Sequence, residues 1–437
     1  MEIVGLSKEN IEKISKIKKE ADFIQKYRLE SYDYFKKIAM PSFGPTINLD
    51  FSKIIYYKNS DIDDSIKKDW NQILKPIKTE LEDLGVLESE QHMDGMGVQY
   101  ESEVIYHSML KELTEKKVIF TSIEEAFRKY PDLVKKYFGK IVSNKENKFA
   151  SLNGAVFSGG SFIYIPPNTH LDRPLQSYFR INSKNMGQFE RSLIIVDDNS
   201  YLHYIEGCTA PTYSDSALHA AVVEIYVGKN STCRYSTIQN WAVNVYNLVT
   251  KRALVEESGT MEWIDGNIGS LVTMKYPCCV LKGDNSKGTC ITISVASNKQ
   301  NQDSGAKMIH LGKNTKSNII SKSIAQTGGN ATYRGKVYID SKASNSDALV
   351  KCDSLILDDV SKSDTIPNNT NYNVDSTIEH EATVSKINED TLFYLMSRGL
   401  SEDAATELIV LGFIEKFREE LPMEYAVELN GLIKRNL

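Results

Sequence analysis

The sequence contains two sets of residues with metal or sulfur chemistry, and the first is a set of cysteines. These are Cys208, Cys233, Cys278, Cys279, Cys290 and Cys352. Thiolates are soft ligands for iron, copper and zinc. No two cysteines form a Cys-x-x-Cys pair, which excludes the common zinc-finger and thioredoxin patterns. The adjacent Cys278 and Cys279 have poor geometry for an ordinary disulfide. Because the sequence shows no export signal, we expect all six cysteines to be reduced thiols, most of them small core residues.

The second set is the string Glu379-His380-Glu381. In an extended strand, Glu379 and Glu381 share one face about 7 Å apart, while His380 points to the opposite face. All three side chains can therefore bind one metal only where the strand bends or ends. The alternative is a solvated strand end that carries charged side chains.

The region around these residues is β-rich. From about residue 146, short β-prone runs follow one another with turn residues between them, a spacing that fits a sandwich, a barrel or a stacked β-solenoid. A repeated turn favours the solenoid: Val227-Gly-Lys-Asn-Ser-Thr and Leu311-Gly-Lys-Asn-Thr-Lys each precede a strand, and Val196-Asp-Asp-Asn-Ser-Tyr has the same cadence. Because the period is irregular, this pattern alone leaves the sandwich and the barrel open.

Helical patterns precede this region. Ser7 can cap a first helix, and apolar positions predict a second helix over residues 21–39. Residues 51–57 resemble a short strand, and Ser122 begins a capping box that opens another helix.

Helical patterns also follow it. One helix is expected from Asn388 to Arg398, Ser401 caps the next, and Pro422 lies near the start of the last. Such short helices bury little apolar surface alone, so they should dock on the β region or on a partner.

We therefore predict a mainly β chain in three parts: a mainly helical region at 1–145, a β core at 146–385 and a helical region at 386–437. The net charge of −6 argues against nonspecific nucleic-acid binding, and no apolar run approaches the roughly 18 residues of a membrane-spanning helix. The N-terminus lacks the basic start and apolar stretch of a secretory signal, so we expect the protein to act in the compartment where it is made.

Long strings throughout the chain resemble the SufB/SufD family of the SUF iron–sulfur cluster assembly system. They include Gln99-Tyr-Glu-Ser-Glu-Val, Gly159-Gly-Ser-Phe-Ile-Tyr-Ile-Pro, Tyr204-Ile-Glu-Gly-Cys-Thr-Ala-Pro, Thr237-Ile-Gln-Asn-Trp, Asn247-Leu-Val-Thr-Lys-Arg, Ala306-Lys-Met-Ile-His-Leu and Glu379-His-Glu-Ala-Thr-Val-Ser-Lys-Ile. The Gly-Cys-Thr-Ala-Pro and Gln-Asn-Trp strings are similar to the SufB branch. The resemblance covers nearly the whole sequence.

The resemblance implies a right-handed parallel β-helix between helical N- and C-terminal regions. It also implies a scaffold, not an enzyme, that accepts persulfide sulfur and holds a nascent iron–sulfur cluster for transfer. The expected partners are the paralogue SufD or a second SufB, the ATPase SufC bound through the C-terminal helices, and a cysteine desulfurase system as sulfur donor. A reduced flavin on the complex is a further expected cofactor. The expected location is the bacterial cytoplasm, with the plastid stroma as the alternative.

ATP hydrolysis is expected in a partner, since the chain has no Gly-x-x-x-x-Gly-Lys phosphate loop. Two departures from the family pattern concern other regions. The segment Thr365-Ile-Pro-Asn-Asn-Thr-Asn-Tyr-Asn replaces an aromatic-Pro-aromatic segment of many relatives, and an N-terminal cysteine cluster found in some relatives is absent.

Cluster ligands follow from the same resemblance. Cys352, in Val350-Lys-Cys-Asp, matches the family's essential cysteine, and Glu379, His380 and Glu381 match its acidic-histidine string. Glu381 is the first choice among these three and His380 the next. Lys351 would lower the pKa of the Cys352 thiol only if its ammonium approached the sulfur, and strand alternation can place it remotely.

A sulfur route is implied as well. Cys208 matches the expected first acceptor of persulfide sulfur, and five residues match positions along an internal sulfur path. These are Arg180, Asn182, Gln239, Trp241 and Lys251. The alternative for the five is a polar network that satisfies the β-helix interior. Cys233, Cys278, Cys279 and Cys290 are expected to be structural.

Two other classes of function remain open from the residues alone. A polysaccharide lyase or hydrolase would need paired carboxylates or a basic group on adjacent rungs, and no such set is identifiable. A structural solenoid or adhesin is weakened by the missing export signal, and it predicts no cluster on anaerobic reconstitution with iron and sulfide.

Overall fold

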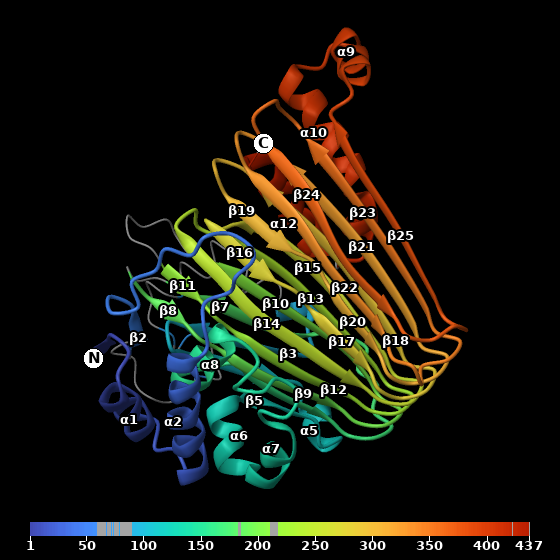
Figure 1. Cartoon of the computed structure of the whole chain (residues 1–437). Coiled ribbons are helices and arrows are strands. Elements are labelled where there is room, and N and C mark those ends of the chain that lie inside the picture. Colours follow the sequence, from blue (N-terminus) through green and yellow to red (C-terminus); the bar gives the residue numbers. More distant parts are fainter. Residues whose placement is uncertain are drawn as a thin grey trace.

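The computed structural model describes residues 1–58, 67, 71, 73, 78, 90–181, 185–209, 217–421 and 423–436. Strands make up 44% and helices 23% of the structure, and the strands wind into a β-solenoid of about seven turns with helices in the N- and C-terminal regions (Figure 1). This architecture confirms the predicted mainly β solenoid and excludes the sandwich and the barrel.

Two long sheets form the walls of the solenoid. The first has ten strands, in this spatial order: β25 (Thr377–Lys386), β23 (Asp347–Ile356), β21 (Lys316–Ala325), β18 (Lys287–Ala296), β15 (Thr260–Gly269), β13 (Thr232–Trp241), β10 (Tyr201–Thr209), β7 (Leu175–Arg180), β3 (Gly95–Tyr100) and β4 (Glu103–Met109). Its strands are parallel except for the β3–β4 pair.

The second sheet has thirteen strands. Ten follow one path, in the order β16 (Val272–Lys275), β19 (Asn301–Ser304), β22 (Asn330–Ile339), β20 (Lys307–His310), β17 (Cys278–Leu281), β14 (Val245–Val255), β12 (Val222–Val227), β9 (Arg191–Val196), β6 (Ser161–Ile165) and β5 (Ile119–Ser122). Three lie beside it: β8 (Gly187–Gln188), β11 (Ala217–His219) and β24 (Lys362–Asn371). A separate two-stranded sheet joins β1 (Glu2–Val4) to β2 (Ile55–Lys58), so the predicted strand at 51–57 begins later than expected.

The repeated turn predicted from the sequence recurs at the corner of successive rungs. Asn199, Asn230 and Asn314 have φ angles of 56°, 53° and 55°, a left-handed conformation that asparagine tolerates better than most residues. Each donates its backbone N–H to the next rung, for example from Asn199 to the carbonyl oxygen of Lys229 at 2.8 Å. The recurring Asn therefore allows the turns to stack.

Helices cover the N-terminal part of the solenoid. They are α1 (Lys8–Ile17), α2 (Asp22–Lys37), α5 (Lys111–Glu115), α6 (Ile123–Lys129), α7 (Pro131–Tyr137) and α8 (Lys148–Val156), with a short 3-10 helix, η2, at Glu90–His92. Ser7 and Ser122 cap α1 and α6 as predicted, because their side chains accept from Asn10 N and Glu125 N. The division at residues 145 and 146 stays a prediction as a domain boundary. Strands β3, β4 and β5 precede it and pair with the two long sheets, whereas α8 follows it.

A buried ion pair within the second sheet also binds the segment that follows α7. The Arg191 guanidinium lies 2.7 Å from a carboxylate oxygen of Glu224, and both side chains are fully buried. Glu224 also accepts the backbone N–H groups of Gly139, Ile141 and Val142 at 2.9–3.1 Å. The charges are thus compensated by hydrogen bonds, as burial requires.

The C-terminal helices divide into a packed group and an exposed helix. Residues of α10 (Glu402–Phe413), α11 (Glu415–Glu419) and α12 (Met423–Asn436) share an apolar core with the outer face of the ten-stranded sheet. Its members include Ile238, Ile264, Ile291, Val410 and Phe417. In contrast, α9 (Glu389–Ser397) projects from the end of the solenoid (Figure 1) and has no buried residue. Pro422 lies outside the described residues.

Acid should destabilise the fold through His310. Burial lowers the pKa of its imidazole to about 4, and the ring bonds to Thr315 and Ser317 hydroxyls at 2.8 and 2.9 Å. The folded-state pKa of His310 lies below the unfolded value of about 6.5. The stability that the neutral, buried imidazole contributes is therefore fully present above pH 6.5 and is lost as the pH falls toward 4. The loss should reach about 3 kcal/mol.

Urea unfolding at about pH 7.5 and about pH 4.5 checks this expectation. The His310→Gln variant should start from a lower stability but lose less of it on acidification. An equal loss in both proteins would contradict the assignment.

Candidate functional site

Cys352 lies on the inner face of the solenoid, one rung from its C-terminal end. In the register of the ten-stranded sheet it sits between Ser321 of β21 and Ala382 of β25. Its side chain is buried, and its Sγ lies 3.7 Å from Nε2 of His380. His380 is two residues before Ala382 on the final strand, so alternation places it on the same face as Cys352. The structure therefore brings together two of the predicted cluster ligands.

Glu379 and Glu381 point to the opposite face of the same strand. Glu381 lies 3.2 Å from Lys351, which is also turned outward. Lys351 is therefore remote from the Cys352 sulfur, as strand alternation allowed. His380 is held from its other side by the amide of Asn369 at 3.3 Å, a residue of the segment that departs from the family pattern. Among the described residues, no three His, Cys, Asp or Glu side chains form a group that could hold a metal ion.

Burial sets the protonation of this pair. Burial raises the pKa of the Cys352 thiol to about 12, and burial lowers the pKa of His380. At neutral pH the sulfur is thus a thiol and the imidazole is neutral. Iron binding would displace the thiol proton, since the thiolate is the ligand.

Cys208 lies on the same inner face, on β10, five strands from Cys352 along the ten-stranded sheet. The Cys208 side chain is 2% exposed, and its Sγ lies 3.7 Å from Oε1 of Glu206 and 4.0 Å from Nε2 of Gln239. Burial, and then the negative charge of Glu206, raise the pKa of the Cys208 thiol well above its ordinary value. Cys208 is therefore a protonated thiol with a carboxylate on one side and an amide on the other.

Gln239 is fixed by two donors. Its Oε1 accepts from Lys275 Nζ at 2.9 Å and from Asn247 Nδ2 at 2.8 Å. With the oxygen occupied in this way, the amide nitrogen faces Cys208. An N–H donor at this position stabilises a sulfur anion, which is the role expected for Gln239.

Two buried lysines share one buried carboxylate beside this cysteine. Lys251 lies 3.4 Å and Lys275 2.9 Å from oxygens of Asp265, and Lys251 lies 4.0 Å from Glu206. Burial works to raise the pKa of Asp265, but the two ammonium groups outweigh it and hold that pKa below its ordinary value. Burial lowers the pKa of Lys275 to about 8. Two ammonium groups and two carboxylates therefore lie in the interior of the solenoid, where a purely apolar core would contain no charge.

Two of the three remaining predicted path residues lie in the described part of the chain. Trp241 is buried in one apolar cluster with Cys208, and its ring packs 4.5 Å from that of His219. Arg180 lies one rung away, where its guanidinium donates to the Thr209 hydroxyl at 3.1 Å. Asn182 lies outside the described residues.

A ladder of polar residues connects the two cysteines through the interior. Successive rungs place Glu206, Thr237, Asp265, Thr292, Ser321 and Cys352 in one register column. A parallel column two residues further along each strand holds Cys208, Gln239, Asn267, Ser294, Ser323 and Ser354. All twelve side chains are buried. The columns lie inside the same strands whose outer face is covered by α10–α12.

Sequence reasoning missed several members of this interior. They are Glu206, Asp265, Lys275, Asn247 and His219, the last of which bonds to Glu190 at 2.5 Å and to Asn247 at 2.8 Å. A signal was present in the recurring polar-x-polar triplets Glu206-Gly-Cys, Thr237-Ile-Gln, Asp265-Gly-Asn, Thr292-Ile-Ser, Ser321-Lys-Ser and Cys352-Asp-Ser. Their spacing of 27 to 31 residues follows the irregular rung length.

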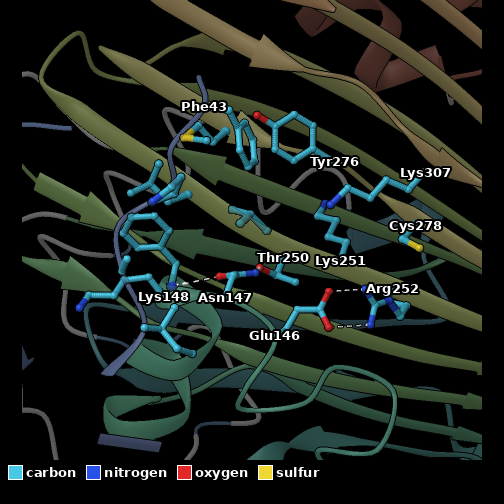
Figure 2. Close-up of a pocket in the computed structure, with 17 residues that line it drawn as sticks. Phe43, Glu146, Asn147, Lys148, Thr250, Lys251, Arg252, Tyr276, Cys278 and Lys307 are labelled. Atoms are coloured by element: carbon cyan, nitrogen blue, oxygen red, sulfur yellow. Dashed lines mark hydrogen bonds and ion pairs between the residues drawn. The ribbon is translucent and has the colours of Figure 1, made fainter. Parts of the chain in front are cut away.

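A pocket on the outer surface is separate from this ladder. It encloses about 310 Å³ between the segment after α2 and the second sheet, and Phe43, Lys148, Tyr276 and Lys307 help to line it (Figure 2). At its edge Glu146 and Arg252 form a paired ion contact at 2.9 Å. Lys251 belongs to the strand that forms its wall, but the Lys251 ammonium contacts Asp265 in the interior.

No helix in the described part of the chain is long and apolar enough to cross a membrane.

Comparison with known proteins agrees with this arrangement. Residues 179–413 match the family described as "SUF system FeS cluster assembly, SufBD core domain", and residues 4–177 match "SufBD protein N-terminal region". The chain is 52% identical over 432 residues to the "Iron-sulfur cluster assembly protein SufB" of Bacillus subtilis, covering 98% of this chain and 92% of that protein. It is 54% identical, with the same coverage, to an "Iron-sulfur cluster assembly SufBD family protein" of Staphylococcus saprophyticus. These matches span both the solenoid and the helices that flank it, and the chain therefore belongs to the SufBD family of the SUF iron–sulfur cluster assembly system.

Proposed function

We propose that this chain is a SufB-type scaffold on which an iron–sulfur cluster is built, and that it is not itself an enzyme. It receives persulfide sulfur at Cys208 and holds the nascent cluster at Cys352. The observation that carries the proposal is the polar ladder, which begins at a buried, hydrogen-bonded Cys208 and ends at the Cys352–His380 pair. A solenoid with a purely structural role would gain nothing from charged groups in its interior, because their burial is costly.

Cys208 and Cys352 are too far apart to exchange sulfur directly, and the polar ladder is the interior route between them that we propose. Thiol–persulfide exchange requires contact between sulfur atoms. Five strand spacings of about 4.8 Å separate β10 from β23, so the strands that carry Cys208 and Cys352 lie roughly 24 Å apart. Arg180, Asn182, Gln239, Trp241 and Lys251 belong to our proposed path, with Gln239 and Lys251 stabilising anionic sulfur. A polar network with a purely structural role would make the same contacts, and sulfur tracing distinguishes it from the path.

The cluster site is incomplete within one chain. Cys352 and His380 provide two ligands, whereas iron–sulfur clusters are usually held by four. The neighbouring edge strands β24 and β25 each pair with only one other strand in the described part of the chain, and Tyr372 and Val374 nearby are 64% and 99% exposed. We place the paralogue SufD, or a second copy of this chain, against this open end. Glu379 and Glu381 would join the ligand set only where contact with that partner bends β25.

The other partners complete the assembly. SufC subunits bind at the C-terminal helices and hydrolyse ATP, a cysteine desulfurase system supplies the sulfur, and the complex works in the bacterial cytoplasm. The reduced flavin expected on the complex stays a prediction, and none of the described cavities is assigned to it.

Sulfur tracing tests the proposed direction of transfer. Purified complex is loaded from a desulfurase with isotopically labelled cysteine, and peptides that contain Cys208 and Cys352 are analysed for persulfide. Cys208→Ser should remove the label from both positions, whereas Cys352→Ser should leave the label at Cys208. Label that reaches Cys352 in the Cys208→Ser complex at the normal level would refute the path.

A further inference from the structure

The carboxylate of Glu206 is placed to take a proton from Cys208. Its Oε1 lies 3.7 Å from Cys208 Sγ, within hydrogen-bonding distance for sulfur, and both side chains are buried. The other polar side chain with a bond to this sulfur is Gln239, which presents N–H and cannot accept a proton. Among the described residues, Glu206 is therefore the carboxylate that contacts the reacting sulfur.

The surroundings hold Glu206 in this position. The Tyr235 hydroxyl donates to Oε2 at 2.5 Å, which leaves Oε1 directed at the cysteine. Lys251 lies 4.0 Å from Oε1 and 4.5 Å from the centre of the Tyr235 ring. Two groups thus fix a single carboxylate orientation, as a proton acceptor requires.

A base is needed because the site disfavours the thiolate. Burial raises the pKa of the Cys208 thiol well above its ordinary value, so almost no thiolate exists at neutral pH. The thiolate, not the thiol, attacks a persulfide. Water has little access to Cys208, which is 2% exposed, so it cannot readily act as the base.

We infer that Glu206 is the catalytic base that activates Cys208 as a sulfur acceptor, an inference that rests on the proposed function. The Cys208 proton passes to Glu206 Oε1, and the thiolate attacks the terminal sulfur of a donor persulfide, R–S–SH. The donor S–S bond breaks, a new S–S bond forms at Cys208, and the leaving thiolate takes the proton back from Glu206. The sum is R–S–SH + Cys208–SH → R–SH + Cys208–S–SH, with no net change of charge or oxidation state and Glu206 regenerated.

The test measures the rate of persulfide formation at Cys208 in the full-length protein, with cysteine persulfide as the donor and mass spectrometry as the readout. Glu206→Gln keeps the size of the side chain and removes the base. The rate at neutral pH should fall about 100-fold, the lower end of the range for general-base catalysis. The residual rate should then rise with pH as hydroxide replaces the carboxylate, whereas the wild-type rate should be flat.

Matched variants distinguish a Glu206 that accepts the proton from a Glu206 with only a structural role. Glu262→Gln changes an outward-facing carboxylate that pairs with Arg234 one rung away, and it should leave the rate unchanged. Glu206→Asp keeps the base but withdraws it by one methylene, so it should lower the rate and keep the flat profile; this variant decides the matter if Glu206→Gln fails to fold. A wild-type rate in Glu206→Gln, or a loss that is equal at every pH, overturns the inference.

The experiment tests the proposed function separately from the role of Glu206. If Cys208→Ser forms persulfide at the wild-type level, Cys208 is not the acceptor and the function proposed for it is wrong. If Cys208→Ser loses the persulfide while Glu206→Gln retains the wild-type rate, the acceptor stands and only the base assignment falls.

Discussion

Replacing Cys352 with serine is expected to abolish cluster assembly in vivo while leaving the complex with its partners intact. The serine hydroxyl stays protonated and is a hard oxygen ligand, so it cannot replace a thiolate on iron. His380, 3.7 Å away, would then be the one remaining ligand that the described structure places at this site. The measurement is the activity of an iron–sulfur enzyme in cells that depend on the variant, together with copurification of the partner subunits.

Cys233→Ser is the matched control, because it makes the same substitution at another fully buried cysteine of the same solenoid core. It should cost some stability through the buried hydroxyl, about 1–3 kcal/mol, but should preserve assembly. Normal assembly by the Cys352→Ser protein would refute the ligand assignment. Loss of partner binding by that protein would instead assign Cys352 to the interface alone.

The second large effect is expected at the C-terminal helices. Deleting the residues after 387 should abolish copurification of the ATPase subunit. This deletion alone is not specific for ATPase binding, because it also exposes Ile238, Ile264 and Ile291, which α10–α12 cover. A sharper variant is Phe393→Asp on α9, where Phe393 and Tyr394 are 73% and 55% exposed. Large exposed aromatic residues are common binding hot spots, so the affinity should fall at least about 30-fold.

Val4→Asp provides the control for this variant. Val4 is half exposed and belongs to β1, next to the N-terminus. Figure 1 shows the N-terminus far from α9, so a charge at Val4 should leave ATPase binding unchanged. Circular dichroism should show equal folding in both variants. Full ATPase binding by the Phe393→Asp protein would place the ATPase on another surface.

Much of the architecture is determined locally and can be predicted from the sequence. Asn199, Asn230 and Asn314 mark recurring turns because few residues tolerate a left-handed backbone, and the turn strings of the sequence contain them at the same place. Ser7, Ser122 and Ser401 cap helices because a hydroxyl satisfies a free N–H at the first turn. The family resemblance indicated Cys208 and Cys352, and strand alternation correctly separated His380 from the two glutamates beside it.

The interior could not be predicted in the same way, because it depends on which residues from different rungs share a register. Glu206 and Asp265 are 59 residues apart, yet both lie in one column and both contact Lys251. The rung length varies from 27 to 31 residues across this ladder, so no fixed period aligns these residues without the structure. The sequence by itself thus determined the helix caps and the recurring turns, and its family resemblance indicated the solenoid and the two candidate cysteines, since each depends on local conformation or a contiguous motif. Only the tertiary structure decided that Cys352 faces His380 and that Cys208 faces Gln239, because the stacking of rungs sets which side chains from different strands meet in the interior.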